Sequence, residues 1–149
     1  MAAATNLHGT ALVLGERGIL ILGPSGSGKS TLALALISRF RESGRLARLV
    51  ADDQVLASAH GGRLLCRAPA TIRGLVEVYG VGPTPLEVEP AAVIDLAVRL
   101  VPADRLERLP DEAFEEISGC RLPLMAVRER DAGPALLAIA ARILPSPLA

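Results

Sequence analysis

Short apolar runs alternate with glycine-rich turns along the first part of the chain, and this pattern predicts strands before any helix. Residues 11–14 and 19–22 are apolar and β-prone, and the four residues between them begin and end with glycine. Such an arrangement is typical of a β-hairpin with a tight turn. The second predicted strand leads directly into a glycine-rich segment at residues 23–30.

A helical repeat follows the glycine-rich segment. Apolar side chains recur every three or four positions after residue 30, and Ser43 and Gly44 supply a stop signal, so residues 30–42 are predicted to form a helix. The next apolar run, residues 45–51, predicts a returning strand that carries Asp52 and Asp53 at its C-terminal end. Strand, glycine loop, helix and strand in this order indicate an α/β fold.

The rest of the chain is rich in predicted strands and turns. We expect a turn at residues 61–62, a break in regular structure at the Gly- and Pro-containing residues 80–85, and a short acidic helix or loop at 110–118. A closing helix is predicted at residues 134–144. Further strands are predicted at residues 63–67, 75–79, 93–101 and 122–127. We therefore expect one α/β domain over residues 1–149, with a β-rich middle and few helices.

Composition narrows the function classes. Sixteen basic and 16 acidic residues cancel, so no net charge draws the chain to nucleic acid or to an anionic membrane. One Tyr, two Phe and no Trp offer little surface for stacking bases. No apolar run reaches the roughly 18 residues that span a bilayer, and the first ten residues lack the pattern of a signal peptide. We expect a cytoplasmic protein with no nucleic-acid or membrane partner.

The two cysteines, Cys66 and Cys120, have no Cys or His neighbour at metal-ligand spacing. We expect both to be small core residues in a reducing compartment, although the sequence also permits a single disulfide bond.

Residues 23–30, Gly-Pro-Ser-Gly-Ser-Gly-Lys-Ser, match the P-loop pattern of Gly, four residues, Gly, Lys and Ser or Thr. In a P-loop the backbone N–H groups and the following helix N-terminus surround phosphate oxygens, the lysine reaches the β/γ-phosphates, and the hydroxyl ligates Mg²⁺. An ordinary glycine-rich turn also fits the pattern, but Lys29 is the only lysine among the 16 basic residues. We expect ATP and Mg²⁺ as cofactors, with Ser30 on the metal. The predicted nucleotide-binding residues are Gly23, Pro24, Ser25, Gly26, Ser27, Gly28, Lys29, Ser30 and Thr31.

The pair Asp52 and Asp53 ends the predicted strand after this helix. Phosphoryl transfer to a hydroxyl needs one acidic group beside the metal and another that accepts the hydroxyl proton. Two adjacent aspartates supply both. The alternative is an Asx-turn or a helix cap, which is a common use of Asp at a strand end.

Four segments together resemble the catalytic domain of HPr kinase/phosphorylase. They are residues 7–9 with His8, the P-loop, residues 50–53 with the Asp pair, and residues 77–82, Glu-Val-Tyr-Gly-Val-Gly. The resemblance implies an HPr kinase or PEP carboxykinase-like P-loop fold and an ATP-dependent serine kinase. Its implied substrate is HPr or an HPr-like phosphocarrier protein of a phosphotransferase system. The resemblance further implies a homo-oligomer, which is a hexamer in that family. The chain resembles the short form of the family, which has no N-terminal domain.

The resemblance also implies roles for individual residues. Asp52 is implied as the general base and acid for the substrate serine, Asp53 and Glu77 as metal-side carboxylates, and His8 as a residue that orients the Asp pair. The alternative for His8 is a plain structural residue on a strand.

Two departures from the family pattern bear on the reaction. Tyr79 stands where the family carries Arg, although a second register through Arg73 and Gly74 would place Thr71 at the Glu position. Residues 127–131 lack the proline of the family's basic loop, which puts the phosphorylase reaction in question. A regulatory module that binds ATP without turnover and a P-loop kinase of small metabolites are therefore the alternatives.

Overall fold

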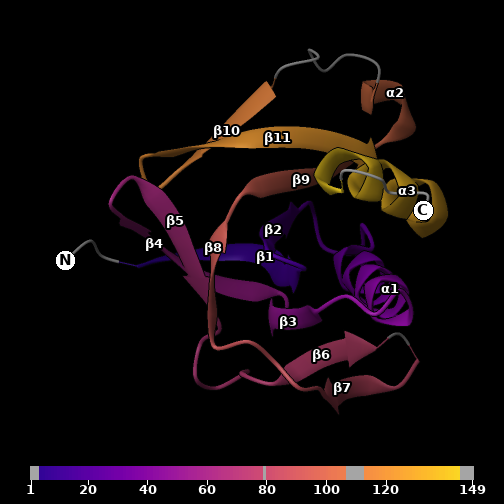
Figure 1. Ribbon diagram of the computed structural model, residues 1–149, viewed down its shortest axis with the longest axis horizontal. Coiled ribbons are helices and arrows are strands. Elements are labelled where there is room, and N and C mark those ends of the chain that lie inside the picture. Colours follow the sequence, from indigo (N-terminus) through magenta and orange to yellow (C-terminus); the bar gives the residue numbers. More distant parts are fainter. Residues whose placement is uncertain (1–3, 79, 107–112, 145–149) are drawn as a thin grey trace.

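The computed structural model describes residues 4–78, 80–106 and 113–144 (Figure 1). Tyr79 and residues 110–112 of the predicted acidic segment lie outside the described residues. The strands are β1 (Thr5–Leu14), β2 (Arg17–Leu22), β3 (Ala47–Ala51), β4 (Gln54–His60), β5 (Arg63–Arg67), β6 (Leu75–Val78), β7 (Gly82–Pro85), β8 (Ala91–Ile94), β9 (Leu96–Val101), β10 (Ala113–Ile117) and β11 (Cys120–Arg128). The helices are α1 (Lys29–Glu42), α2 (Ala103–Leu106) and α3 (Ala132–Ile143).

A nine-stranded sheet forms the centre, with strand order β10-β11-β9-β2-β1-β4-β5-β8 and β3 paired to β1. The pairs β2–β9 and β9–β11 are parallel, and the other pairs along this order are antiparallel. The small two-stranded sheet β6-β7 lies apart from the large one, near β3 (Figure 1). The mixed, mostly β architecture with few helices agrees with the α/β class expected from the sequence.

Strand β1 aligns β3 and β4 end to end. Residues 11–14 of β1 pair with β3, and residues 5–8 of the same strand pair with β4. Asp52 and Asp53 form the break between the two partner strands, and Asp53 has a positive φ of 69°. Such irregularities in strand pairing re-aim side chains and are frequent beside active sites.

The two larger helices cover one face of the sheet. Leu32 and Leu36 of α1 join Ile139 of α3 and Leu12 of β1 in one buried apolar cluster. The opposite face is buried by the bend of the sheet, where β4 and β5 pack against β11 through a second cluster that includes Cys66 and Cys120. The first cluster therefore holds the first turns of α1 against the sheet.

Two segments form strands where the sequence analysis expected none, and both expectations were wrong. In the 110–118 segment, β10 pairs antiparallel with β11. Glu115 of β10 also forms an ion pair with Arg99 of β9, the strand on the other side of β11. The positive-φ turn at Ser118 and Gly119 closes this hairpin. In the 80–85 segment, β7 pairs only with β6, so its prolines occupy an edge strand that does not need their missing N–H groups.

Other boundaries also differ from the predicted ones. Strand β4 and the single-turn helix α2 were not predicted. The run 93–101 is divided into β8 and β9 by Asp95, whose carboxylate accepts a hydrogen bond from the Gly18 N–H over 2.9 Å and another from Arg63 over 3.1 Å. The hairpin β1-β2 and the helices α1 and α3 confirm the corresponding predictions.

Both cysteines are free and buried, as expected of core residues. Burial raises the pKa of the Cys66 thiol to about 12, which keeps the thiol protonated and unreactive at neutral pH.

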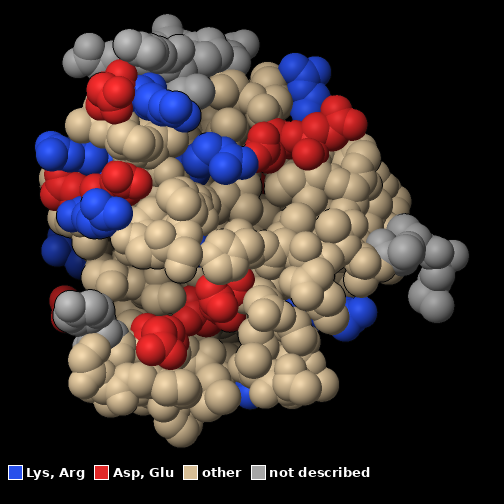
Figure 2. Space-filling model, turned by 180° about the vertical axis from the view of Figure 1, so that it is seen from behind, with Lys and Arg blue, Asp and Glu red and all other residues tan. Residues whose placement is uncertain are grey.

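Among the helices of the described ranges, none is long and apolar enough to cross a membrane. On the face that Figure 2 shows, positive and negative side chains lie side by side in the upper part, and a separate group of acidic side chains lies below the centre.

Gly18 of β2 lies where the backbone of β8 approaches closely. A Cβ at this position would collide with the backbone carbonyl of Val93 in β8, so Gly18→Ala forces the backbone apart. We expect Gly18→Ala to lower the free energy of unfolding by roughly 1–3 kcal/mol or more, measured by urea denaturation. The matched control is Gly133→Ala in α3, where a Cβ meets nothing within 4 Å. That variant should be neutral or up to about 1 kcal/mol more stable, and equal losses in both variants would contradict the close approach.

Candidate active site

The glycine-rich loop connects β2 to α1, which is the strand–loop–helix context that the P-loop motif requires. Gly26 and Gly28 have φ angles of 80° and 98°, a backbone conformation that glycine adopts without strain. Gly28 is the N-cap of α1, so the first free N–H groups of the helix face the same space as the loop. The loop therefore combines turned backbone donors with the positive end of a helix dipole.

Lys29 lies inside the loop. Its Nζ donates hydrogen bonds to the carbonyl oxygens of Gly23 and Pro24 over 2.9 and 3.0 Å, and the residue is 7% exposed. Burial lowers the pKa of the Lys29 ammonium below its usual value, while the nearby charges of Asp53 and Asp52 act in the opposite direction. A phosphate anion beside this poorly hydrated ammonium would stabilise its charge.

Ser27 contributes the one buried side-chain polar atom in the described residues that has no hydrogen-bond partner. This hydroxyl belongs to the same loop and is completely buried beside Gly23, so it meets a ligand only if the loop changes its conformation.

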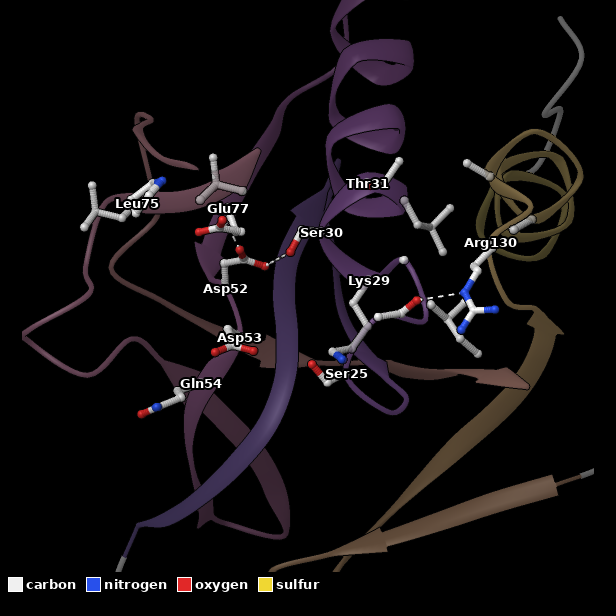
Figure 3. Close-up of a pocket in the computed structure, with 18 of the residues that line it drawn as sticks. Ser25, Lys29, Ser30, Thr31, Asp52, Asp53, Gln54, Leu75, Glu77 and Arg130 are labelled. Atoms are coloured by element: carbon white, nitrogen blue, oxygen red, sulfur yellow. Dashed lines mark hydrogen bonds between the residues drawn. The ribbon is translucent and has the colours of Figure 1, made fainter. Parts of the chain in front are cut away.

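Asp52 is the most highly connected side chain of the site. Its Oδ1 accepts hydrogen bonds from Thr10 Oγ1 over 2.9 Å and from Ser30 Oγ over 2.7 Å, and its Oδ2 accepts one from the Glu77 N–H over 2.9 Å (Figure 3). The residue is 4% exposed. One carboxylate thus links β1, the start of α1 and β6.

Asp53 and His8 lie together nearer to the solvent. His8 Nδ1 is 3.5 Å from Asp53 Oδ1, and both side chains are about half exposed. The strand pairing explains this proximity, because His8 lies opposite Gln54, the residue that follows Asp53. The resemblance placed His8 beside the Asp pair, and the structure brings it to the second aspartate.

Glu77 reaches the site from β6. Its backbone N–H contacts Asp52, while its exposed side chain lines the same cavity as Asp53 and Ser30. Of the two ways to align the family signature, the one that uses Glu77 as the glutamate therefore places that residue at the cavity. Thr71, the glutamate position of the other register, is not among the cavity-lining residues.

A cavity of about 770 Å³ joins these groups (Figure 3). The loop residues Ser25, Gly26, Gly28, Lys29, Ser30 and Thr31 line it. Apolar side chains also line the cavity, namely Ile72 and Leu75 at β6 and Leu100 of β9, which lies against Gly23 of the loop. The volume and the mixture of apolar wall and polar groups are typical of a site for a small organic ligand. Gly23, Pro24 and Ser27 complete the loop without lining the cavity.

The oxygen ligands present fit Mg²⁺ better than a metal that needs a complete protein cage. Within the described part of the chain, no group of three or more His, Cys, Asp or Glu side chains could hold a metal ion. Magnesium is usually held by one or two carboxylates together with substrate phosphates and water. Ser30, Asp53 and Glu77 supply such oxygens around the loop.

Sequence reasoning missed Thr10, and it noted the 127–131 segment without foreseeing that Arg130 contacts the phosphate loop. Thr10 is 0% exposed and holds Asp52, and the only sequence signal was a polar residue inside an apolar strand. Arg130 Nε donates to the Gly26 carbonyl over 2.9 Å from the turn between β11 and α3. Nothing in the local sequence indicates that this turn reaches the loop.

Comparison with known proteins gives the family. The HPr Serine kinase C-terminal domain family matches residues 1–133. The chain belongs to this family.

Two curated relatives carry the name of this family's kinase. HPr kinase/phosphorylase of Brevibacillus brevis is 42% identical over 83 residues, which cover 55% of this chain and 25% of the relative. The Clostridium beijerinckii protein of the same name is 43% identical over 82 residues, with 55% and 25% covered. The chain thus spans about a quarter of the length of the curated relatives it matches.

A solved structure of the family shares the fold. The Hpr(Ser) kinase/phosphatase from Coxiella burnetii superimposes with a TM-score of 0.75 at 25% sequence identity. The match covers 91% of this chain and 86% of that chain.

Thr10→Val removes one donor from Asp52 without changing the side-chain shape. A hydrogen bond to a charged group contributes roughly 1.5–3 kcal/mol, so we expect the free energy of unfolding to fall by about that amount in urea denaturation. Thr5→Val on the same strand is the control, because Thr5 is exposed and its loss should change stability by less than about 0.5 kcal/mol. If Thr10→Val is as stable as the control, the Thr10 hydroxyl does not hold Asp52.

Proposed function

We propose that this chain is an ATP-dependent serine kinase that phosphorylates HPr or an HPr-like phosphocarrier protein of a phosphotransferase system. The observation that carries the proposal is the Asp52 carboxylate, which accepts a hydroxyl hydrogen bond inside the cavity that also contains Lys29. A hydroxyl-accepting carboxylate beside a phosphate-binding loop is the arrangement that phosphoryl transfer to serine needs. Family membership supports the same reaction.

In this proposal the loop binds the phosphates of ATP. Lys29 exchanges its two carbonyl partners for phosphate oxygens. Ser30, Asp53 and Glu77 hold Mg²⁺. The metal offsets charge on the phosphates when it is bound. Lys29 adds a compact positive charge at the same place.

Asp52 serves as the general base in the proposal. A serine hydroxyl is a weak nucleophile until a base accepts its proton. Asp52 Oδ1 already accepts hydrogen bonds from two hydroxyl groups, those of Thr10 and Ser30, so its surroundings suit a hydroxyl donor. The substrate serine would take the place of Ser30 on this oxygen, which leaves the Ser30 hydroxyl for the metal.

His8 is a positioning residue in the proposal. It contacts Asp53 and none of the groups assigned to proton transfer, so it acts through the orientation of that carboxylate. Loss of His8 should therefore alter the metal dependence of the reaction more than its maximal rate.

The protein substrate is inferred from the names of the relatives, and the assembly from the resemblance stated in the sequence analysis. Their names describe a kinase and phosphorylase of HPr, and a phosphocarrier of that class is the substrate we propose. We propose a cytoplasmic location, where ATP and such carriers are found, and a homo-oligomer of the hexameric type. The reverse reaction, phosphorolysis, is tested separately by incubating the chain with phosphoserine-HPr and inorganic phosphate and measuring the loss of phosphoserine.

Mass spectrometry of an HPr-type phosphocarrier tests the function. After incubation with the chain, Mg²⁺ and ATP, the carrier should gain one phosphate on serine. Asp52→Asn should reduce the initial rate at least about 100-fold while ATP binding, measured by calorimetry, is retained. Asp53→Asn is the matched variant, and its loss should be partly recovered at higher Mg²⁺ concentration.

Three other outcomes would reject parts of the proposal. ATP binding with no transfer to any carrier favours the regulatory module, and consumption of a small hydroxyl compound favours a metabolite kinase. Full activity of Asp52→Asn together with an Asp53→Asn protein that Mg²⁺ does not rescue would move the base to Asp53.

A further inference from the structure

Arg130 lies in the turn between β11 and α3 and is bonded to the phosphate loop twice. Its backbone N–H donates to the Ser27 carbonyl over 3.0 Å, and its Nε donates to the Gly26 carbonyl over 2.9 Å (Figure 3). The two contacts join segments that are about a hundred residues apart in the sequence. They hold the arginine against the part of the loop that precedes Lys29.

The backbone at Arg130 adopts a conformation that arginine disfavours. Its φ is 54°, in the left-handed region, where a residue with a Cβ is strained and glycine is not. Residues in such conformations occur preferentially at active sites and ligand-binding turns. An arginine at a position whose backbone suits glycine implies that the guanidinium itself has a role.

The guanidinium has donors left for a ligand. Arginine carries five N–H donors, and only Nε is bonded to the loop. Glu129 approaches Nη1 at 3.9 Å, too far for a hydrogen bond, and the Arg130 side chain is 68% exposed. An exposed ion pair of this length contributes little, so it does not compete strongly with a ligand.

The position of Arg130 faces two cavities. It lines the 770 Å³ cavity of the candidate active site and also a neighbouring cavity of about 530 Å³, together with Arg128 and Asp131. Lys29, the only lysine, is buried and bonds the Gly23 and Pro24 carbonyls of the same loop. Two cations from distant segments thus contact one glycine-rich loop.

We propose that Arg130 binds the phosphate chain of the nucleotide, with Nε fixed on Gly26 and the terminal N–H groups directed to phosphate oxygens. Arginine suits this task because its planar fork matches phosphate geometry and its charge does not titrate. The inference rests on the proposed function, since it assigns a further residue to the same nucleotide site.

Two variants distinguish the effect of the Arg130 charge from the effect of its backbone conformation. Arg130→Gly removes the side chain at a position where glycine is unstrained, and Arg130→Gln keeps an N–H donor for Gly26 but removes the charge. The control is Ser118→Gly, because Ser118 also has a positive φ, 51°, and lies outside the site. Thermal melting should show that both glycine variants remain folded, with midpoints at or above that of the unchanged chain.

Binding is measured by calorimetry with Mg-ATP and with inorganic triphosphate, at low and at high ionic strength. We expect both Arg130 variants to raise the dissociation constant for either ligand at least about tenfold at low ionic strength, and by less at high ionic strength. The Ser118→Gly protein should bind like the unchanged chain.

The results distinguish this inference from the proposed function. If the unchanged chain binds Mg-ATP and the Arg130 variants bind equally well, the role of Arg130 is rejected and the proposed function stands. If only Arg130→Gly loses affinity, the hydrogen bond to Gly26 matters and the charge does not, which also rejects the inference. If the unchanged chain binds neither ligand, both are rejected.

Discussion

The site depends on one buried carboxylate and the donors that satisfy it. Asp52 is almost completely buried, and an ionised group in that position costs several kcal/mol unless it is hydrogen-bonded. Its three donors come from β1, from the first turn of α1 and from β6. The carboxylate therefore holds the phosphate loop, the central strand and the small two-stranded sheet at a common point.

The aspartate pair is divided by the strand geometry around it. Because β3 and β4 lie end to end along β1, the two residues between them leave the regular pairing, and the positive φ of Asp53 turns the chain. Asp52 points to the loop and is buried, whereas Asp53 meets His8 near the solvent. Two adjacent carboxylates thus obtain different surroundings, which is what separate proton-transfer and metal roles require.

Local sequence signals predicted the loop, the hairpin before it and the helix after it, because glycine spacing and apolar periodicity act over a few residues. They failed where pairing with a distant strand decided the structure, as when the acidic run around Glu115 became a strand beside β11. Thr10 and the contact of Arg130 with the phosphate loop were not foreseen for the same reason, since the partners lie 42 and 104 residues away. The roles of the predicted site residues stay predictions, and Tyr79 lies outside the described residues.

A crystal structure of the chain with Mg²⁺ and a non-hydrolysable ATP analogue tests the central claim most directly. The account predicts phosphates within the loop, Lys29 Nζ moved from the Gly23 and Pro24 carbonyls to phosphate oxygens, and the Ser30 hydroxyl on the metal. The terminal phosphate should face Asp52. An analogue bound elsewhere, or a Lys29 that keeps both carbonyl partners in the complex, would contradict the account.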